Sequence, residues 1–240
     1  MSGKHSAVIW DFDGTLVDSR QKNLNVTRAI IQEATGKPWR DFDVLRTMAN
    51  YEASHRRVSN WRVFYAEAFG MTDEDIDRVG CWWSYFQLDN DLVPPAIEGV
   101  PSTLEALSHL RHGIVSMNSR LNIGAILGAN GLNSHFGSVI GYEEVGLSSQ
   151  KPDPEGLLKC IEQLTGFEPG VVFFVGDHVT DAVCAVRARK ELSARGAEIQ
   201  LVSIRAAYGP GVFDDWDTPP DHVAQRADQI VQIVQSYTES

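Results

Sequence analysis

Short apolar runs alternate with amphipathic stretches over most of the chain outside its middle third. Runs rich in Val and Ile, flanked by Gly, Asp or Ser, predict five buried strands: Ala7–Trp10, Gly113–Met117, Ser138–Gly141, Val171–Gly176 and Ile199–Ile204. Apolar residues at helical spacing predict helices near Val100–Arg111, Leu121–Asn130, Pro154–Leu164, Thr180–Ala194 and Val223–Ser236. Because strands and helices alternate, we expect an α/β fold with a parallel sheet covered by helices on both faces.

The segment from about residue 17 to residue 93 breaks this alternation. It contains no convincing strand, but aromatic and aliphatic residues recur at helical spacing, and one helix face would carry Trp61, Phe64, Tyr65, Ala68 and Phe69. Such a stripe is more often the core of a helix bundle than a cofactor site. We expect a second aromatic group to pack into the same bundle: Trp82, Trp83, Tyr85 and Phe86.

A hinge leads from this insertion back to the alternating part of the chain. The stretch Leu92–Gly99 contains two adjacent prolines and a glycine, which favour a linker. We therefore predict a Rossmann-like core formed by residues 1–16 and 95–240, with an α-helical domain inserted over residues 17–94.

Composition and charge narrow the classes of partner. The chain has 240 residues, 43% of them hydrophobic, which is enough for a full globular core. Its 32 acidic and 21 basic residues give a formal net charge of −11. Nucleic acid and anionic membranes would be repelled at long range, so we expect neither as a partner. An anionic small molecule would need a local positive site.

Cysteine usage and the lack of long apolar segments suggest a cytoplasmic protein. Cys81, Cys160 and Cys184 are odd in number, far apart and without metal-type spacing, so we expect reduced thiols that fill the core. The first residues lack the apolar stretch of a signal peptide, and no segment is long enough to span a bilayer. A monomer and a homodimer are both compatible with the sequence.

The most informative motif is Asp11-Phe12-Asp13-Gly14-Thr15, directly after the first predicted strand. Two carboxylates two residues apart allow one to attack a substrate while the other handles a proton. Gly14 would let the backbone approach a phosphate closely, and the Thr15 hydroxyl could fix the turn. The alternative is an acidic turn that only ends a strand.

Three further signals follow the ends of later predicted strands, where ligands of parallel sheets bind. Ser116 is a weak signal, because a serine there could simply cap the next helix, and Asn118 follows closely. Lys151 precedes Asp153 and Pro154, which we expect at the N-cap and first position of a helix. The last signal is Gly176-Asp177 with Asp181 four residues on.

Together these residues resemble the haloacid dehalogenase-like superfamily of phosphohydrolases, and within it the phosphoglycolate phosphatase-like subgroup. The resemblance covers nearly the whole chain, and the helical insertion directly after the first motif looks like the first type of cap domain in that family. The motifs are specific for the superfamily and much less so for a substrate. The resemblance implies that the core is catalytic and that the insertion covers its site.

The resemblance also implies roles for the motif residues. Asp11 matches the nucleophile that attacks phosphorus and forms an aspartyl-phosphate, and Asp13 matches the general acid and base. Ser116 would bind a phosphate oxygen, and Asn118 would contact the phosphate or the leaving group. Lys151 would offset the charge of the phosphate and of the clustered carboxylates.

A Mg²⁺ cofactor is implied in the same way. Its protein ligands would be Asp11, Asp177 and the backbone carbonyl of Asp13, with Asp181 near or in the coordination shell, because Mg²⁺ prefers a few carboxylates plus water and phosphate oxygens. His178 stands where a small residue is common in the family, and we expect its side chain to turn toward solvent. The stretch 188–198 looks longer than usual, and no function is assigned to it.

Specificity should come from the cap, because the core motifs handle only the phosphoryl group. The most basic stretch of the insertion contains Arg46, His55, Arg56, Arg57 and Arg62. Neighbouring helical residues point about 100° apart, so at most one of Arg56 and Arg57 should face a substrate. A solvated helix face is the alternative for each of these residues. An arginine that does face the site would suit a carboxylate or second phosphate on the leaving group.

The function predicted from these motifs is Mg²⁺-dependent hydrolysis of a small phosphorylated metabolite. Within the superfamily that these motifs resemble, Asp13 disfavours a true dehalogenase, which has no leaving oxygen to protonate, and a phosphonoacetaldehyde hydrolase, in which that aspartate is replaced by alanine. A β-phosphoglucomutase-like phosphotransferase keeps all four motifs and remains an alternative. A non-catalytic binding protein on the same fold should have lost a charged motif residue, whereas all of them are present here.

Overall fold

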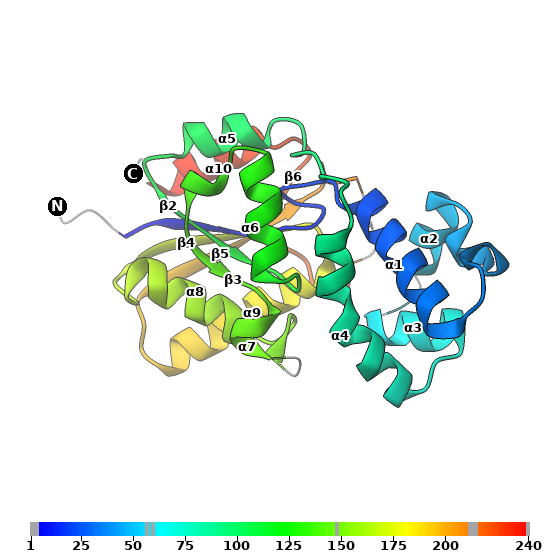
Figure 1. Ribbon diagram of the computed structural model, residues 1–240. Coiled ribbons are helices and arrows are strands. Elements are labelled where there is room, and N and C mark those ends of the chain that lie inside the picture. Colours follow the sequence, from blue (N-terminus) through cyan, green and yellow to red (C-terminus); the bar gives the residue numbers. More distant parts are fainter. Residues whose placement is uncertain (1–4, 56–57, 59–60, 147–148, 211–215, 239–240) are drawn as a thin grey trace. The chain divides into compact units, whose positions relative to one another are not determined.

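A computed structural model describes residues 5–55, 58, 61–146, 149–210 and 216–238 (Figure 1). The chain divides into two compact units, one formed by Met1–Asp18 with Pro95–Ser240 and the other by Ser19–Pro94. The first contains all the strands of the sheet, and the second is helical. Among the described residues, no helix combines the length and the apolar character needed to cross a membrane.

The sheet has six parallel strands in the order β3-β2-β1-β4-β5-β6. Their bounds are β1 Ala7–Trp10, β2 Arg111–Val115, β3 Phe136–Ile140, β4 Gly170–Gly176, β5 Ile199–Ala206 and β6 His222–Ala224. β1 lies between β2 and β4, with Ile9 opposite Gly113 on one side and Phe174 on the other. The strand order changes direction at β1, and such switch points create the ligand crevices of parallel sheets. The predicted α/β fold is confirmed.

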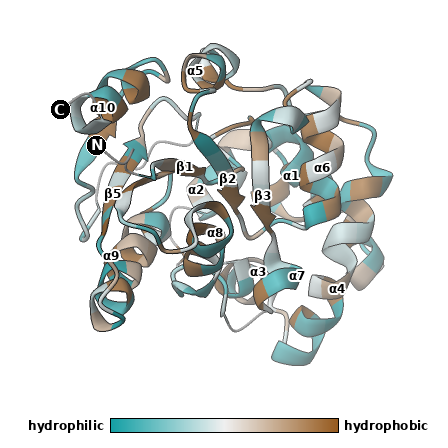
Figure 2. Cartoon of the chain, turned by 90° about the vertical axis from the view of Figure 1, so that its left-hand side faces the viewer, coloured by the Kyte–Doolittle hydropathy of each residue, from teal (hydrophilic) through white to brown (hydrophobic). Residues whose placement is uncertain are grey.

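Helices cover both faces of this sheet because each strand presents alternate side chains to each face. Val8 and Trp10 of β1 pack in one cluster with α5 (Val100–Ala106), α6 (Arg120–Ala129) and α10 (Gln229–Thr238). Ala7 and Ile9 pack in the other cluster with α8 (Glu155–Thr165) and α9 (Val179–Ala194). Figure 2 shows the strands largely in the hydrophobic colour, as expected for a sheet buried on both sides.

The helical unit is held together by its own apolar core. Its helices are α1 (Arg20–Thr35), α2 (Met48–His55), α3 (Trp61–Phe69) and α4 (Asp73–Asp89). Phe64 and Tyr65 of α3 are buried among residues of α1 and α4, and Trp61, Ala68 and Phe69 pack against them, as the aromatic stripe predicts. Trp82, Trp83 and Phe86 join this cluster, but Tyr85 is 66% exposed, so the prediction was wrong for that residue.

The predicted start of the last helix was wrong. A helix was expected from Val223, but the chain first forms β6, and α10 begins only at Gln229. β6 pairs with β5 through His222 and Ile204, and the Asp221 carboxylate accepts a hydrogen bond from the Ser203 amide at 2.7 Å. β6 has three residues, His222–Ala224, and is held by its partners in β5. A strand this short contains no apolar run that the sequence could reveal.

The described cysteines carry no disulfide, but they are not all in the core. Cys160 and Cys184 are buried, and burial raises the pKa of each thiol to about 12, which keeps it protonated and unreactive. Cys81 on α4 is exposed, so the expectation that it fills the core was wrong. α4 begins with three consecutive acidic residues after the Thr72 cap, and the thiol lies in its middle turn.

Candidate active site

The loop after β1 brings the first motif to the edge of the sheet where β4 also ends. The Asp11 N–H donates to the Val175 carbonyl at 2.8 Å, which continues the β1–β4 pairing up to the motif. Gly14 has a φ of +83°, and a Cβ at this position would overlap the Asp177 carboxylate. Only glycine therefore allows the loop to approach Asp177 so closely.

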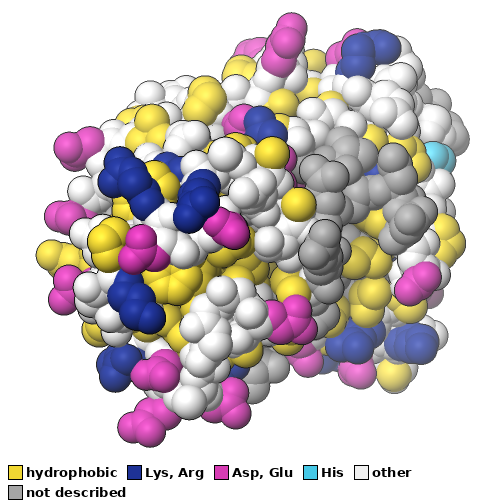
Figure 3. Space-filling view, turned by 90° about the vertical axis from the view of Figure 1, so that its right-hand side faces the viewer, with side chains coloured by type: hydrophobic (Ala, Val, Ile, Leu, Met, Phe, Trp, Pro, Cys, Tyr) yellow, Lys and Arg dark blue, Asp and Glu magenta, His cyan; other side chains and the backbone are white. Residues whose placement is uncertain are grey.

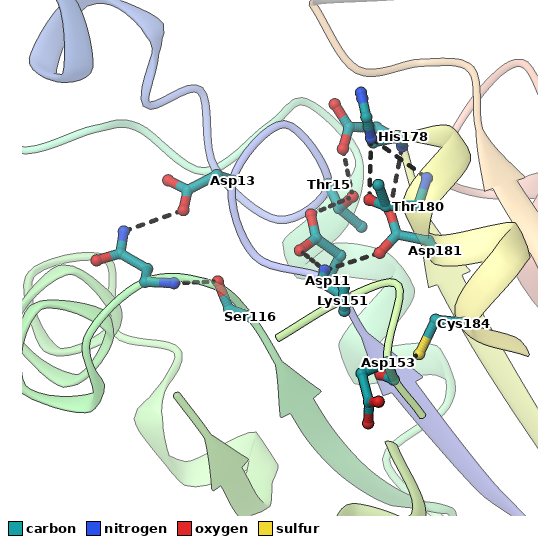
Figure 4. A network of polar contacts seen from close by, with 12 residues as sticks. Asp11, Asp13, Thr15, Ser116, Lys151, Asp153, His178, Thr180, Asp181 and Cys184 are labelled. Atoms are coloured by element: carbon teal, nitrogen blue, oxygen red, sulfur yellow. Dashed lines mark hydrogen bonds and ion pairs between the residues drawn. The ribbon is translucent and has the colours of Figure 1, made fainter. Parts of the chain in front are cut away.

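A buried cation joins two carboxylates at the centre of the site. Lys151 Nζ donates to Asp11 Oδ1 at 2.5 Å and to Asp181 Oδ1 at 2.7 Å, and the three side chains are 4%, 8% and 5% exposed (Figure 4). Burial lowers the pKa of Lys151, but the two carboxylates raise it by more, so the net shift is upward and the ammonium keeps its charge.

The same burial acts in the opposite sense on the carboxyl groups. Burial raises the pKa of Asp11 to about 7, although the Lys151 ammonium lowers it, and the charges of Asp181 and Asp13 raise it further. Burial, followed by the charges of Asp11 and Asp181, also raises the pKa of Asp177 well above its ordinary value. One lysine therefore does not balance the crowded carboxylates, and the site favours a further cation.

Three carboxylates are arranged so that they could hold a metal ion. Asp11, Asp177 and Asp181 each offer an oxygen atom, and these atoms lie within 4.8 Å of one another. An all-oxygen donor set suits Mg²⁺ or another hard divalent cation. The Thr15 hydroxyl lies 3.1 Å from Asp11 Oδ2 and 3.5 Å from Asp177 Oδ1, so it fixes the turn as the sequence suggested.

Asp13 lies apart from this cluster and faces the loop after β2 (Figure 4). Its Oδ2 accepts a hydrogen bond from Asn118 Nδ2 at 3.0 Å. The Asn118 backbone N–H donates to Ser116 Oγ at 3.1 Å, and both side chains are buried. Ser116 does not cap α6, because the cap is Ser119, whose Oγ accepts from the Asn122 N–H at 3.1 Å.

His178 and Asp153 differ from the sequence predictions. The His178 side chain is half-buried and caps α9, with Nδ1 accepting from the Thr180 N–H at 3.3 Å, so it does not simply turn toward solvent. Asp153 is not the N-cap residue of α8, because Pro154 takes that position. The Asp153 carboxylate still accepts from the Glu155 N–H at 2.9 Å, so Lys151 lies just ahead of the helix as expected.

The loop after β5 contributes residues that no sequence motif revealed. The Tyr208 hydroxyl donates to the Thr15 carbonyl at 3.2 Å. Burial, together with the charges of Asp177 and Asp11, raises the pKa of Tyr208, so the phenol stays protonated and remains a donor. A Cβ at Gly209 would overlap the Gly14 carbonyl. The loop after β1 is therefore supported by a residue 193 positions away, on the loop after β5, which sequence spacing alone does not indicate.

The basic residues of the helical unit do not form a continuous basic patch among the described side chains. Arg46 pairs with Asp43 at 2.9 Å and Arg62 with Asp77 at 2.7 Å, while the His55 ring stacks on Phe64. In the view of Figure 3, basic side chains lie near acidic ones. Arg56 and Arg57, which the sequence singled out as candidates for substrate binding, lie outside the described residues.

Comparisons with known proteins identify the family of this chain. The family model described as haloacid dehalogenase-like hydrolase matches residues 8–192. The phosphoglycolate phosphatase of Synechococcus elongatus is 30% identical, and the match covers 95% of this chain and 96% of that protein. The N-acetylmuramic acid 6-phosphate phosphatase of Pseudomonas aeruginosa is 28% identical, with 84% and 82% covered.

Solved structures show the same fold. A haloacid dehalogenase-like family hydrolase of Streptococcus pneumoniae superposes with a TM-score of 0.68 at 16% identity, covering 96% of this chain and 99% of that one. A hydrolase of the same superfamily from Geobacter sulfurreducens gives a TM-score of 0.63 at 22% identity, covering 97% and 98%. With the family model matching most of the sequence, the chain belongs to the haloacid dehalogenase-like hydrolases and is a phosphatase of that family.

Proposed function

We propose that this phosphatase hydrolyses a small organic phosphomonoester by way of an aspartyl-phosphate on Asp11, with Mg²⁺ as its cofactor. The observation that carries the proposal is the buried Lys151 ammonium, which bonds Asp11 and Asp181 beside a third carboxylate on Asp177. Phosphoryl transfer requires in-line positioning and compensation of charge on the transferring oxygens, and the Lys151 ammonium supports the second requirement.

The carboxylates of Asp11 and Asp177, with Asp181 beside them, are the groups that would hold Mg²⁺. When bound, the ion offsets the negative charge of the phosphate and of its ligands. The backbone carbonyl of Asp13 is a further proposed ligand. Lys151 keeps its positive charge next to Asp11 and contributes to the same compensation.

The reaction follows from the two groups of the first motif. An Asp11 carboxylate oxygen attacks phosphorus, the bond from phosphorus to the leaving oxygen breaks, and Asp13 transfers its proton to that oxygen. Water then attacks the aspartyl-phosphate and gives a proton back to Asp13, which frees Asp11 and releases inorganic phosphate. Ser116 directly follows the end of β2, and Asn118 lies on the loop after it. Asn118 bonds both Asp13 and Ser116, and we expect Ser116 and Asn118 to contact the phosphate or the leaving group.

The proposed substrate class is a small acid or sugar carrying one phosphate, with phosphoglycolate as the first compound to test. The support is the 30% identity to the Synechococcus elongatus phosphoglycolate phosphatase over nearly the whole of both chains. We propose that the helical unit acts as the cap that selects the leaving group, and that Arg56 or Arg57 contributes to this selection.

A phosphate-release screen tests the proposal. The purified protein with Mg²⁺ is assayed on phosphoglycolate, sugar phosphates, nucleoside monophosphates, N-acetylmuramic acid 6-phosphate, phosphonoacetaldehyde and pyrophosphate, with Asp11→Asn as the control for contaminating phosphatase. We expect release from at least one small monoester by the wild type and none by the variant. Conversion of a sugar phosphate to its isomer without phosphate release would instead establish a phosphotransferase.

A further inference from the structure

A chain of hydrogen bonds runs from α6 to the proposed acid and base. Asn122 Nδ2 donates to Asn118 Oδ1 at 3.0 Å, and Asn118 Nδ2 donates to Asp13 Oδ2 at 3.0 Å. Asn122 is 1% exposed and Asn118 is 4% exposed, so solvent does not readily replace either side chain as a partner. These hydrogen bonds therefore connect the first turn of α6 with the carboxyl group of Asp13, the proposed acid and base.

The direction of the Asn118 amide is set by the donors around it. The Ser119 backbone N–H donates to Asn118 Oδ1 at 2.8 Å, and the Asn122 NH₂ group donates to the same atom. The Ser119 backbone N–H can only donate, so it requires an oxygen there, and the Asn122 NH₂ group fits the same oxygen. The NH₂ group of Asn118 must then face Asp13. A half-turn of the amide would place its oxygen against the Asp13 carboxylate and leave two donors facing an NH₂ group.

Helix capping does not account for the Asn122 side chain. The N-terminus of α6 already has its cap in Ser119, whose Oγ accepts the Asn122 backbone N–H. The backbone of Asn118 is anchored separately, because its carbonyl accepts from the Tyr142 N–H at 3.2 Å and its N–H donates to Ser116 Oγ. The Asn122 side chain supplies the second donor on the Asn118 amide oxygen.

We infer that Asn122 is a positioning residue, which acts through Asn118 to fix the plane of the Asp13 carboxyl group. This inference rests on the proposed function, in which Asp13 protonates the leaving oxygen. Holding Oδ2 of Asp13 determines where its other oxygen lies, and proton transfer depends steeply on that placement. Loss of the Asn122 donor leaves the Asn118 amide oxygen to the Ser119 N–H alone, so the amide is held less firmly and Asp13 is less well aimed.

The test compares two substrates that differ in their need for a proton. The alkoxide leaving group of phosphoglycolate must be protonated, whereas p-nitrophenyl phosphate releases a stable phenolate. The kcat/KM of each substrate covers the steps up to departure of its leaving group. We expect Asn122→Ala to lower kcat/KM for phosphoglycolate about tenfold, a part of the roughly 10²- to 10⁴-fold effect of general acid–base catalysis, and to leave kcat/KM for p-nitrophenyl phosphate within about twofold.

Two controls separate positioning from loss of stability. Asn130 lies at the opposite end of α6, where Nδ2 donates to the Ile126 carbonyl at 2.9 Å and Oδ1 accepts from the Ala96 N–H at 2.9 Å. Asn130→Ala should lower the thermal midpoint without changing the ratio of the two kcat/KM values. In an Asp13→Asn background, Asn122→Ala should have no further effect on phosphoglycolate, because the group that it positions has been removed.

If the alanine variant does not fold, Asn122→Ser takes its place, because the serine hydroxyl is too short to reach Asn118. We expect the same fall in kcat/KM for phosphoglycolate. Equal losses on both substrates, or an additive loss in the Asp13→Asn background, would show that Asn122 is only structural and overturn the inference. A wild-type protein that hydrolyses neither substrate nor any other monoester would contradict the proposed function itself.

Discussion

The charged centre of the sheet unit and the ion pairs of the helical unit both place a basic side chain beside an aspartate at the same spacing. Lys151 Nζ lies 2.7 Å from Asp181 Oδ1, and Arg62 Nη1 lies 2.7 Å from Asp77 Oδ1. Their surroundings differ, because the first two side chains are 4% and 5% exposed and the second two are 37% and 66% exposed. Distance alone therefore does not distinguish a site from a surface contact.

The difference in burial decides what each pair can do. An exposed pair is screened by water and salt and contributes about 0–1 kcal/mol to stability. A buried pair is costly to assemble, but its charges act on neighbouring groups with little screening. At the buried centre, burial raises the pKa values of Asp11 and Asp177, and the charge of Lys151 opposes that shift. The sheet unit gathers buried charges in one cluster, whereas the ion pairs Arg46–Asp43 and Arg62–Asp77 of the helical unit lie at its surface.

Metal removal is the largest perturbation of the buried centre. Treatment with a chelator should abolish phosphate release, because the crowded carboxylates would then repel a phosphate dianion. Added Mg²⁺ should restore the activity, and Ca²⁺ should restore it poorly, because its looser coordination would misplace the phosphate. A phosphate-release assay on a metal-stripped sample checks this, and full activity there would contradict the proposed cofactor.

Substitution of the buried cation tests the comparison directly. Lys151→Met should lower kcat by roughly 10²- to 10³-fold, as expected for the loss of an electrostatic group at the reacting centre. It should also cost about 3 kcal/mol of unfolding free energy, because Asp11 and Asp181 lose their shared partner. The matched variant Arg62→Met should change the unfolding free energy by less than about 1 kcal/mol. Urea denaturation measures the unfolding free energy of each variant. Equal losses of unfolding free energy in Lys151→Met and Arg62→Met would refute the distinction between the buried and the exposed pair.

The contrast between the two regions would be smaller if a basic residue of the helical unit also acted on the substrate. Arg56→Ala and Arg57→Ala are each tested, and for one of them we expect kcat/KM for phosphoglycolate to fall about tenfold, consistent with the loss of one charge-assisted hydrogen bond. p-Nitrophenyl phosphate should be spared, because its leaving group has no carboxylate. Equal losses on both substrates, or none for either variant, would assign specificity to other residues.

The smallest effect concerns a buried group that is neutral. His112 Nδ1 accepts from the Trp10 indole N–H at 3.0 Å, and its Nε2 lies 2.9 Å from the Leu107 carbonyl. Burial lowers the pKa of His112 below 6.5, so the unfolded chain binds a proton there more readily than the folded one. This contribution to stability is complete above about pH 6.5 and is lost as the pH falls toward the folded pKa.

The variant His112→Gln isolates this contribution from the other titrating groups. Between pH 7.5 and pH 5.5, the thermal midpoint of the wild type should fall further than that of the variant, by about 1–3 °C, which corresponds to a fraction of a kcal/mol in a chain of this size. Parallel melting curves over this range would show that His112 does not titrate as proposed.

The sequence was sufficient for the fold and for the residues that lie on strand ends. Apolar runs located five of the six strands, because a strand buried on both faces needs a continuous run of apolar residues. Asp11 and Asp177 were identifiable because carboxylates are uncommon directly after such runs, and Lys151 because it precedes a predicted helix start at this point in the order of motifs. Whether their roles are those of the family stays a proposal, which the variants above test.

The residues that the sequence did not reveal depend on partners far along the chain. Asn122 looks like an ordinary helix residue until Asn118 links it to Asp13, which lies 105 residues before Asn118. Tyr208 gains its role only when the loop after β5 meets the Thr15 carbonyl. β6 likewise exists only through its pairing with β5. Such contacts are set by tertiary packing, which local periodicity does not encode.

The most direct test of the central claim is the detection of a phosphoryl group on Asp11. The wild-type protein is mixed with Mg²⁺ and its best substrate from the screen, quenched in acid within the first turnover, digested and examined by mass spectrometry, with Asp11→Asn treated in parallel. We expect the peptide that contains Asp11 to carry the mass of one phosphoryl group in the wild type and not in the variant, and the variant to release no phosphate. Phosphate release by the Asp11→Asn protein at a rate near that of the wild type would contradict the account.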